Sequence, residues 1–247
     1  MIALFSLVLL GFFLGMRHAT DPDHVIAVST IVTRQPTIRA ALLIGSLWGV
    51  GHTLTIIAVG AAIVLFTIVI PPRLGLSMEM AVAIMLILLG MWNLTGIFEQ
   101  IRGLRPSDGD QSEQHRHRDD EKPITWLDRR LGGLRIYQVL RPLAVGLVHG
   151  LAGSAAVALL VLALIKNPWW AMAYLMLFGI GTIAGMMLIT AAIGAVFAYA
   201  SRRFARAERC LRFASGVLSL GFGLFLAYQI ALVDGLFAGH PAVTPPH

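Results

Sequence analysis

Six long apolar segments divide this chain of 247 residues, and each is long enough to cross the hydrocarbon core of a membrane as a helix. Lipid offers the backbone no hydrogen-bonding partner, so such segments fold as α-helices. Hydrophobic residues make up 57% of the chain and charged residues only 13%, whereas a soluble domain has about 25% charged residues. The sequence therefore predicts an all-α, polytopic membrane protein. The six predicted spans are residues 2–33, 40–70, 78–101, 139–165, 168–200 and 211–233.

Basic residues are concentrated in alternate connections between these segments. The first, third and fifth connections hold sixteen Lys and Arg residues, whereas the second and fourth hold only Arg73 and Lys166. Connections rich in Lys and Arg remain on the cytoplasmic side of a membrane. The sequence thus predicts a multi-pass protein of the cell inner (cytoplasmic) membrane with both termini outside. The basic residues of these connecting segments account for the high pI. They are expected to lie against the lipid bilayer, and nucleic acid is not expected as a partner.

The two halves of the chain resemble each other at an offset of 130 or 131 residues. Leu14–Ala19 aligns with Val145–Gly150, and Trp48–Gly51 aligns with Phe178–Gly181. Each half has three spans, so the halves are expected to have opposite orientations, as in the inverted repeats of many secondary transporters. The predicted regions are a first three-helix repeat at 1–101, a hydrophilic cytoplasmic loop at 102–138, a second three-helix repeat at 139–233 and a short outward-facing tail at 234–247.

The first segment contains a group of titratable residues, His18, Asp21, Asp23 and His24. A charged side chain in the middle of a membrane helix costs about 2.5–3.5 kcal/mol on insertion scales. Imidazole and carboxylate groups are suitable ligands for divalent transition metals, so the group predicts a metal site. The structural alternative is a proline-kinked helix in which an Asp–His pair satisfies its own polar groups.

Pro22 lies within this group and is expected to interrupt the helix. On a regular helix, Asp21 would lie within about 60° of His18, but His24 would lie about 120° away and Asp23 about 140° away. A kink at Pro22 would bring Asp23 and His24 toward His18. It would also leave the His18 carbonyl without its helical hydrogen-bond donor.

Other polar residues within the apolar segments are second candidates for this site. His52 follows Gly51 in the second segment and is expected to be a ligand or to line the ion pathway. His149 aligns with His18 in the repeat, and the alternative for it is a hydrogen-bonded remnant of the duplication. Asn93 is either a polar gate or an interhelical hydrogen-bonding residue. His115 and His117 lie in the hydrophilic loop, where a solvated role is favoured over metal transfer.

The segment from Arg17 to Val25, with the sequence Arg-His-Ala-Thr-Asp-Pro-Asp-His-Val, resembles the signature of the nickel/cobalt transporter family. In that family the residues matching His18, Asp23 and His24 recognise the metal. The family's second motif, Gly-His-Ser/Thr, resembles residues 51–53 of this chain. The resemblance implies passage of Ni²⁺ or Co²⁺ across the cytoplasmic membrane.

Two features differ from the typical uptake permeases of that family. Those proteins have eight spans with the signature in the second, whereas this chain has six predicted spans with the signature in the first. Their motif in the later half carries acidic residues, and residues 177–185 of this chain have none. The chain is therefore more similar to the short members labelled urease-accessory or efflux-like proteins.

We therefore expect a carrier without a resident cofactor, in which Ni²⁺ or Co²⁺ is the transported substrate. One alternative is an intramembrane metal-dependent hydrolase that uses the same residues to hold a catalytic zinc. Another is a membrane factor that delivers metal to a nickel enzyme, and a cytoplasmic metal acceptor protein is a candidate partner. The predicted metal-site residues are His18, Asp23, His24, His52, Asp21 and His149.

Overall fold

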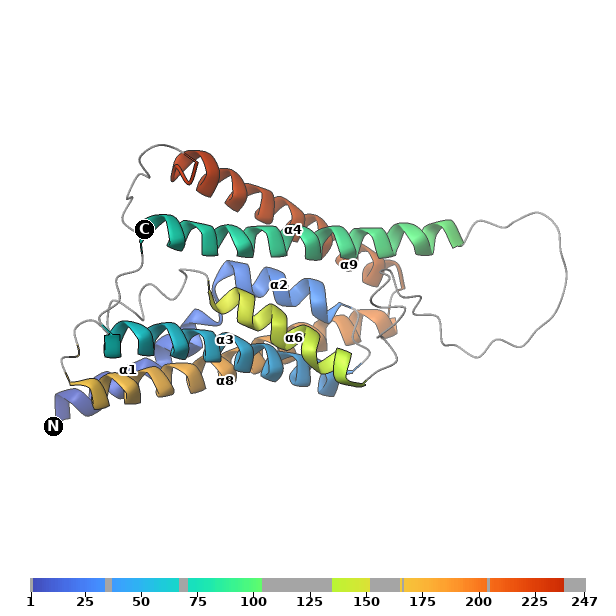
Figure 1. Ribbon diagram of the computed structural model, residues 1–247. Coiled ribbons are helices and arrows are strands. Elements are labelled where there is room, and N and C mark those ends of the chain that lie inside the picture. The colour runs from blue at the N-terminus through green and yellow to red at the C-terminus, as the bar shows by residue number, and fades with distance from the viewer. Residues whose placement is uncertain are drawn as a thin grey trace, which may run out of the picture.

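A computed structural model describes residues 2–33, 37–66, 71–103, 135–151, 165, 167–203 and 205–237. These residues form helices and connecting turns with no strand among them (Figure 1), which confirms the all-α prediction. The helices are α1 (Ile2–His18), α2 (Pro22–Val32), α3 (Ile38–Phe66), α4 (Pro72–Gly103), α6 (Arg135–Gly150), α8 (Pro168–Arg203) and α9 (Ala205–Tyr228), and α9 continues into a short π-helix, η2 (Gln229–Val233).

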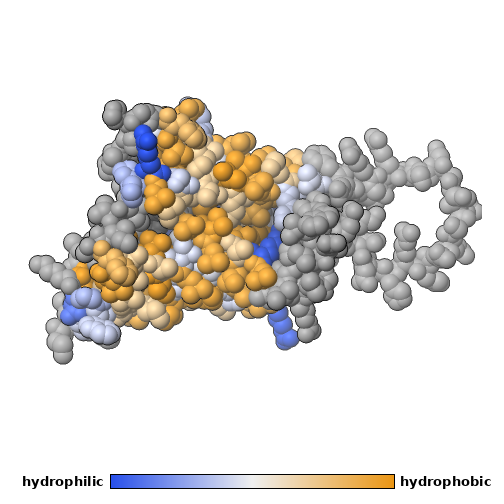
Figure 2. All heavy atoms as spheres, viewed as in Figure 1, coloured by the Kyte–Doolittle hydropathy of each residue, from blue (hydrophilic) through white to orange (hydrophobic). Residues whose placement is uncertain are grey.

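Four helical stretches are long and apolar enough to cross a membrane. They are Ile38–Phe66, Pro72–Thr95, Pro168–Ala200 and Arg209–Val233, and they correspond to the second, third, fifth and sixth predicted spans. Orange, hydrophobic side chains cover much of the described surface in Figure 2, as expected for helices that face lipid. Residues 152–164 of the fourth predicted span, most of the loop at 102–138 and most of the tail at 234–247 lie outside the described residues.

The first predicted span consists of two helices rather than one kinked helix. Helix α1 ends at His18, and Pro22 occupies the first turn of α2. Proline is well suited to this position because the first turn of a helix leaves its N–H groups without intrahelical acceptors. The expectation of a free His18 carbonyl is wrong, because the Asp21 N–H donates to that oxygen at 3.1 Å. The turn therefore satisfies its own backbone while it separates α1 from α2.

The helices pack in pairs around a buried interior. Helix α8 lies against both α1 and α3, α6 lies against α3, and α4 pairs with α9. Helix α2 contacts α9, α8 and α4, so it connects the α4–α9 pair to the other helices (Figure 1). Ala27 and Val32 of α2, Trp48 of α3 and Leu86 of α4 are fully buried in this interior.

Glycines allow the closest approaches between helices. A Cβ atom on Gly15 of α1 would collide with the backbone of α8 at Phe178 and Thr182. A Cβ atom on Gly146 of α6 would collide with the backbone of α3 at Trp48. Small residues at such contacts let helix backbones approach closely in membrane proteins. These contacts bring the ends of α1 and α6 against the middle of α8 and α3.

Gly146→Ala should destabilise the protein because the new methyl group overlaps the α3 backbone, which cannot move aside as a flexible side chain can. Overpacking of this kind costs about 1–3 kcal/mol. Gly221→Ala on α9 is the matched control, since nothing lies within 4 Å of its added Cβ. Thermal unfolding of both variants in detergent measures the difference. A Gly146→Ala protein as stable as Gly221→Ala would contradict the close contact between α3 and α6.

Candidate metal-binding site

Four histidines from four helices meet in the interior of the helix bundle. His18 is the last residue of α1, His24 lies in the first turn of α2, His52 lies in the middle of α3 and His149 lies near the end of α6. Their exposed fractions are 7%, 1%, 0% and 0%, respectively. The helix break between residues 18 and 22 thus brings His18 and His24 close together, with their ring centroids 4.7 Å apart.

The first group of donors consists of His18, His24 and His52, and the three ligand atoms lie within 4.8 Å of one another. The Nε2 atoms of His18 and His52 are 2.9 Å apart. Only one of these two nitrogens carries a proton when both rings are neutral, because two facing N–H groups would repel each other. A bare Nε2 on each ring is the arrangement that a metal ion would use.

Asp21 contacts the far side of the His18 ring. Its Oδ2 lies 2.8 Å from His18 Nδ1, so Nδ1–H donates to the carboxylate and Nε2 is left as the bare nitrogen. The Asp21 side chain is 36% exposed, unlike the histidines. Asp21 belongs to neither of the two groups of closely spaced ligand atoms among the described residues. Asp21 is therefore placed to orient the His18 ring, as a carboxylate does when it pairs with a metal-binding histidine.

The second group consists of Asp23, His24 and His149, whose ligand atoms also lie within 4.8 Å of one another. Asp23 joins the two imidazoles: its Oδ1 is 3.1 Å from His24 Nδ1 and its Oδ2 is 3.0 Å from His149 Nε2. Asp23 also accepts a hydrogen bond from the His24 backbone N–H. His149, which aligns with His18 at the offset of 131 residues, therefore lies inside the cluster.

Three ring nitrogens in this cluster have no hydrogen-bond partner among the described residues. They are Nε2 of His24, Nδ1 of His52 and Nδ1 of His149, and each is buried. A buried polar atom without a partner costs free energy, so such atoms require an explanation. Imidazole nitrogens that lack a protein partner next to other imidazoles and a carboxylate are suited to hold a cation.

The backbone contributes to the same chemistry. Helices α1 and α6 both end at the cluster, at His18 and at Gly150. The C-terminal end of a helix carries partial negative charge on its last carbonyl groups, which favours a nearby cation. Half-helices that end near the middle of a membrane supply cation sites in this way in secondary transporters.

Two aromatic side chains that were not predicted as part of the site flank the cluster. Trp48 stacks on His24 with centroids 5.9 Å apart and meets His149 edge-on at 5.5 Å. The Phe178 ring lies 5.6 Å from His18. Both aromatics are buried and pack against the imidazole rings. Their matched positions in the repeat, each before a Gly-x-Gly sequence, are the signal that could have identified them.

Asn93 lies apart from the cluster and joins α4 to α9. Its side-chain amide donates to the Arg212 carbonyl at 3.0 Å and to Ser215 Oγ at 2.9 Å. Of the two alternatives for this residue, the structure supports the interhelical hydrogen bond. His115 and His117 lie outside the described residues.

Comparison with known proteins agrees with this combination of helices and polar cluster. Residues 4–233 match the model of the NicO family, described as high-affinity nickel-transport protein. The chain is 33% identical over 234 residues to the urease accessory protein UreH of Bacillus sp. (strain TB-90), covering 95% of this chain and 96% of that protein. No solved structure matches. The family is one of transporters, and the chain is therefore not an enzyme. With a match over nearly its whole length, the chain belongs to the NicO family of nickel-transport proteins.

Proposed function

We propose that this protein carries Ni²⁺ or Co²⁺ across the cytoplasmic membrane and that the ion binds within the buried cluster of imidazoles and carboxylates. The donors are His18, Asp23, His24, His52 and His149. The family match supports transport of a metal ion, and the chemistry of the cluster supports a divalent transition metal. The intramembrane hydrolase is disfavoured because the matched family transports its metal.

The observation that carries this proposal is the set of three buried imidazole nitrogens without a hydrogen-bond partner among the described residues. In a purely structural cluster, selection would pair these nitrogens with hydroxyl or carbonyl groups, because unpaired polar atoms destabilise a membrane protein. A transported cation explains why the donors remain available. It also explains why they are gathered from four different helices.

An inverted repeat of two three-helix halves is part of the proposal. Its support comes from equivalent contacts in the two halves: Gly15 of α1 meets Phe178 of α8, and Gly146 of α6 meets Trp48 of α3. Each of these pairs is related to the other by the sequence offset of 130 or 131 residues. Alternating access in such proteins uses motion of one repeat against the other around a fixed site. A six-span topology is consistent with this symmetry.

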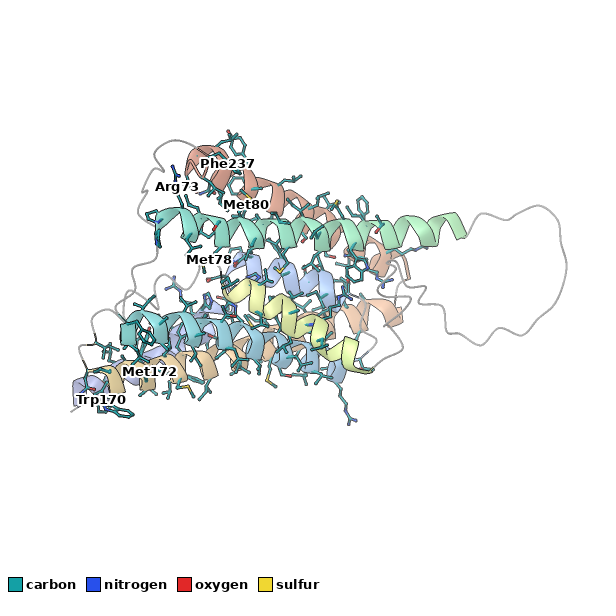
Figure 3. All side chains as sticks on the ribbon, in the orientation of Figure 1. Arg73, Met78, Met80, Trp170, Met172 and Phe237 are labelled. Carbon is teal, nitrogen blue, oxygen red and sulfur yellow. The ribbon has the colours of Figure 1, made fainter. Side chains whose placement is uncertain are left out.

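The distribution of charge supports an orientation with both termini outside. The first turns of α3 and α9 lie at one end of the bundle (Figure 1), and they contain Arg39 and Arg209. Arg73 at the start of α4 and Trp170 at the start of α8 lie at the other end (Figure 3). The end that is rich in arginine would face the cytoplasm.

Nickel delivery to an enzyme is a second candidate role, because the relative from Bacillus is named a urease accessory protein. Delivery and transport share the same membrane site and differ in the destination of the ion. A delivery factor would require a cytoplasmic acceptor protein, whereas a carrier would move nickel into vesicles that contain no other protein.

Radioactive nickel flux, measured in both directions across cells that express the protein, tests the proposed function. His18→Ala should lower the flux by roughly 10–100-fold or more, because it removes a donor and the partner of His52 Nε2. Ser29→Ala on α2 is the matched control, since among the described residues its hydroxyl donates to the Ile26 carbonyl of its own helix. Equal flux in His18→Ala and Ser29→Ala cells, at matched expression, would refute transport through this cluster.

Pro22→Ala should favour a continuous helix across the α1–α2 turn, because alanine accepts the helical conformation that proline interrupts. Asp23 and His24 would then rotate away from His18, and nickel flux would fall although the protein still inserts. Flux together with the amount of protein in the membrane fraction checks this prediction. Normal flux in a well-expressed Pro22→Ala protein would contradict the role of the helix break.

Asp21→Asn should weaken nickel binding by roughly 10–100-fold, as for other groups that orient a metal-binding histidine. The neutral amide accepts the hydrogen bond from His18 Nδ1–H less strongly than a carboxylate does. The ring proton is then held less firmly at Nδ1, and Nε2 is less often the bare, metal-binding nitrogen. Calorimetric titration of the purified protein with nickel measures the affinity. If Asp21→Asn binds nickel as tightly as wild type, Asp21 does not act through His18.

A further inference from the structure

The donors of the cluster form two sets rather than one. One set is His18, His24 and His52, and the other is Asp23, His24 and His149. Within each set all ligand atoms lie within 4.8 Å of one another. His24 is the member that the two sets share, so the cluster holds two neighbouring positions around one imidazole.

Each set contains a pair of donor atoms at the spacing that one metal ion requires. The Nε2 atoms of His18 and His52 are 2.9 Å apart, and Asp23 Oδ2 is 3.0 Å from His149 Nε2. An imidazole nitrogen lies about 2.0–2.1 Å from a metal ion, so two donors at such a separation can occupy adjacent coordination positions. Each pair can therefore supply two adjacent ligands to one ion.

His24 is suited to serve both positions because its two nitrogens lie on different edges of the ring. Nδ1 is 3.1 Å from Asp23 Oδ1, on the side of the second set. Nε2 is buried and has no hydrogen-bond partner among the described residues. The His24 ring centroid lies 4.2 Å from that of His149, 4.7 Å from His18 and 4.9 Å from His52.

The two sets also differ in the helices that reach them. His18 ends α1, which begins at the end of the bundle that carries the N-terminus, and His149 lies near the end of α6, which begins at the opposite end (Figure 1). His18 and His149 occupy equivalent positions in the two halves of the sequence. Each is flanked by an aromatic at an equivalent position, Phe178 beside His18 and Trp48 beside His149.

From this geometry we propose that the cluster provides two alternative binding positions, one at each nitrogen of His24. A single metal ion passes between them as the His24 proton moves from the nitrogen that the ion approaches to the nitrogen that it leaves. The first position uses His18 and His52, and the second uses Asp23 and His149. Asp23 is the one carboxylate in the two sets, which is too little negative charge for two buried divalent cations, so one ion occupies the cluster at a time. The inference rests on the proposed function and adds a path for the ion within the site.

The test combines binding and transport on the full-length protein with Co²⁺ alone as the probe. His18→Gln and His52→Gln disrupt the first position, whereas Asp23→Asn and His149→Gln disrupt the second. These variants keep a polar side chain of similar size, and each position is probed from two helices, so one poorly folded variant does not remove the test. Ser29→Ala is the control, and His24→Gln disrupts both positions.

Calorimetric titration in detergent should give one Co²⁺ per chain for wild type and for all four single-position variants. Each variant should bind Co²⁺ with an affinity lowered by roughly 10–100-fold. The visible spectrum of bound Co²⁺ should indicate nitrogen donors alone when the first position remains. It should indicate nitrogen together with carboxylate oxygen when the second position remains. Co²⁺ flux into proteoliposomes should fall to the background of protein-free vesicles in all four. His24→Gln should lose binding and flux together.

Loss of Co²⁺ binding in the variants of only one position, with unchanged affinity in the others, would overturn the proposal in favour of a single site. Loss of binding in all four variants would likewise mean that one ion needs every donor. Wild-type flux in any folded variant would show that transfer between positions is not needed. A wild-type protein that binds no Co²⁺ or Ni²⁺ would instead refute the proposed function itself.

Discussion

The structure depends on the cost of placing polar side chains where neither water nor lipid can solvate them. Four imidazoles and a carboxylate converge between helices whose other buried residues are largely apolar. They satisfy part of their hydrogen-bonding capacity through each other, most clearly where Asp23 links His24 to His149. Three of their ring nitrogens have no partner among the described residues, and a divalent cation bound by these imidazoles would explain their burial.

The positions of these side chains follow from the packing of the helix backbones. Gly15 and Gly146 allow α1 and α6 to approach α8 and α3 more closely than any side chain would permit. Because both contacts lie within one turn of a helix end, the last carbonyl groups and the terminal histidines are delivered to the same region. The stability of the helix contacts and the geometry of the site are therefore coupled.

The sequence predicted the helical class, and it singled out candidate residues that the structure brings together, because hydropathy and buried charge are local signals. His18, Asp23 and His24 stand out within an apolar segment, and Pro22 indicates the interruption. The sequence did not predict how the interruption is built: helix periodicity suggested a kink, whereas the structure has a separate turn in which Asp21 N–H bonds to the His18 carbonyl. The distinct contact of Asp21 with His18 Nδ1 depends on that turn, so helical angles alone could not reveal it.

Contacts between residues that are far apart in the sequence were harder to predict. No acidic residue or other histidine lies near His149 in the sequence. Its place beside Asp23 arises from the packing of α6 against α3. The aromatic neighbours Trp48 and Phe178 were visible as repeat positions, but their contact with imidazoles depends on the tertiary fold.

Nickel K-edge X-ray absorption on the nickel-loaded, full-length protein tests the central claim most directly. The account predicts a shell of nitrogen and oxygen donors with the outer-shell scattering of several imidazole rings and with no sulfur. A shell that contains sulfur, from Cys210 or from methionine, or a shell of water oxygens without imidazole would contradict it. Cys210 is exposed and lies near the start of α9, which contributes none of the proposed donors, so the two results are readily distinguished.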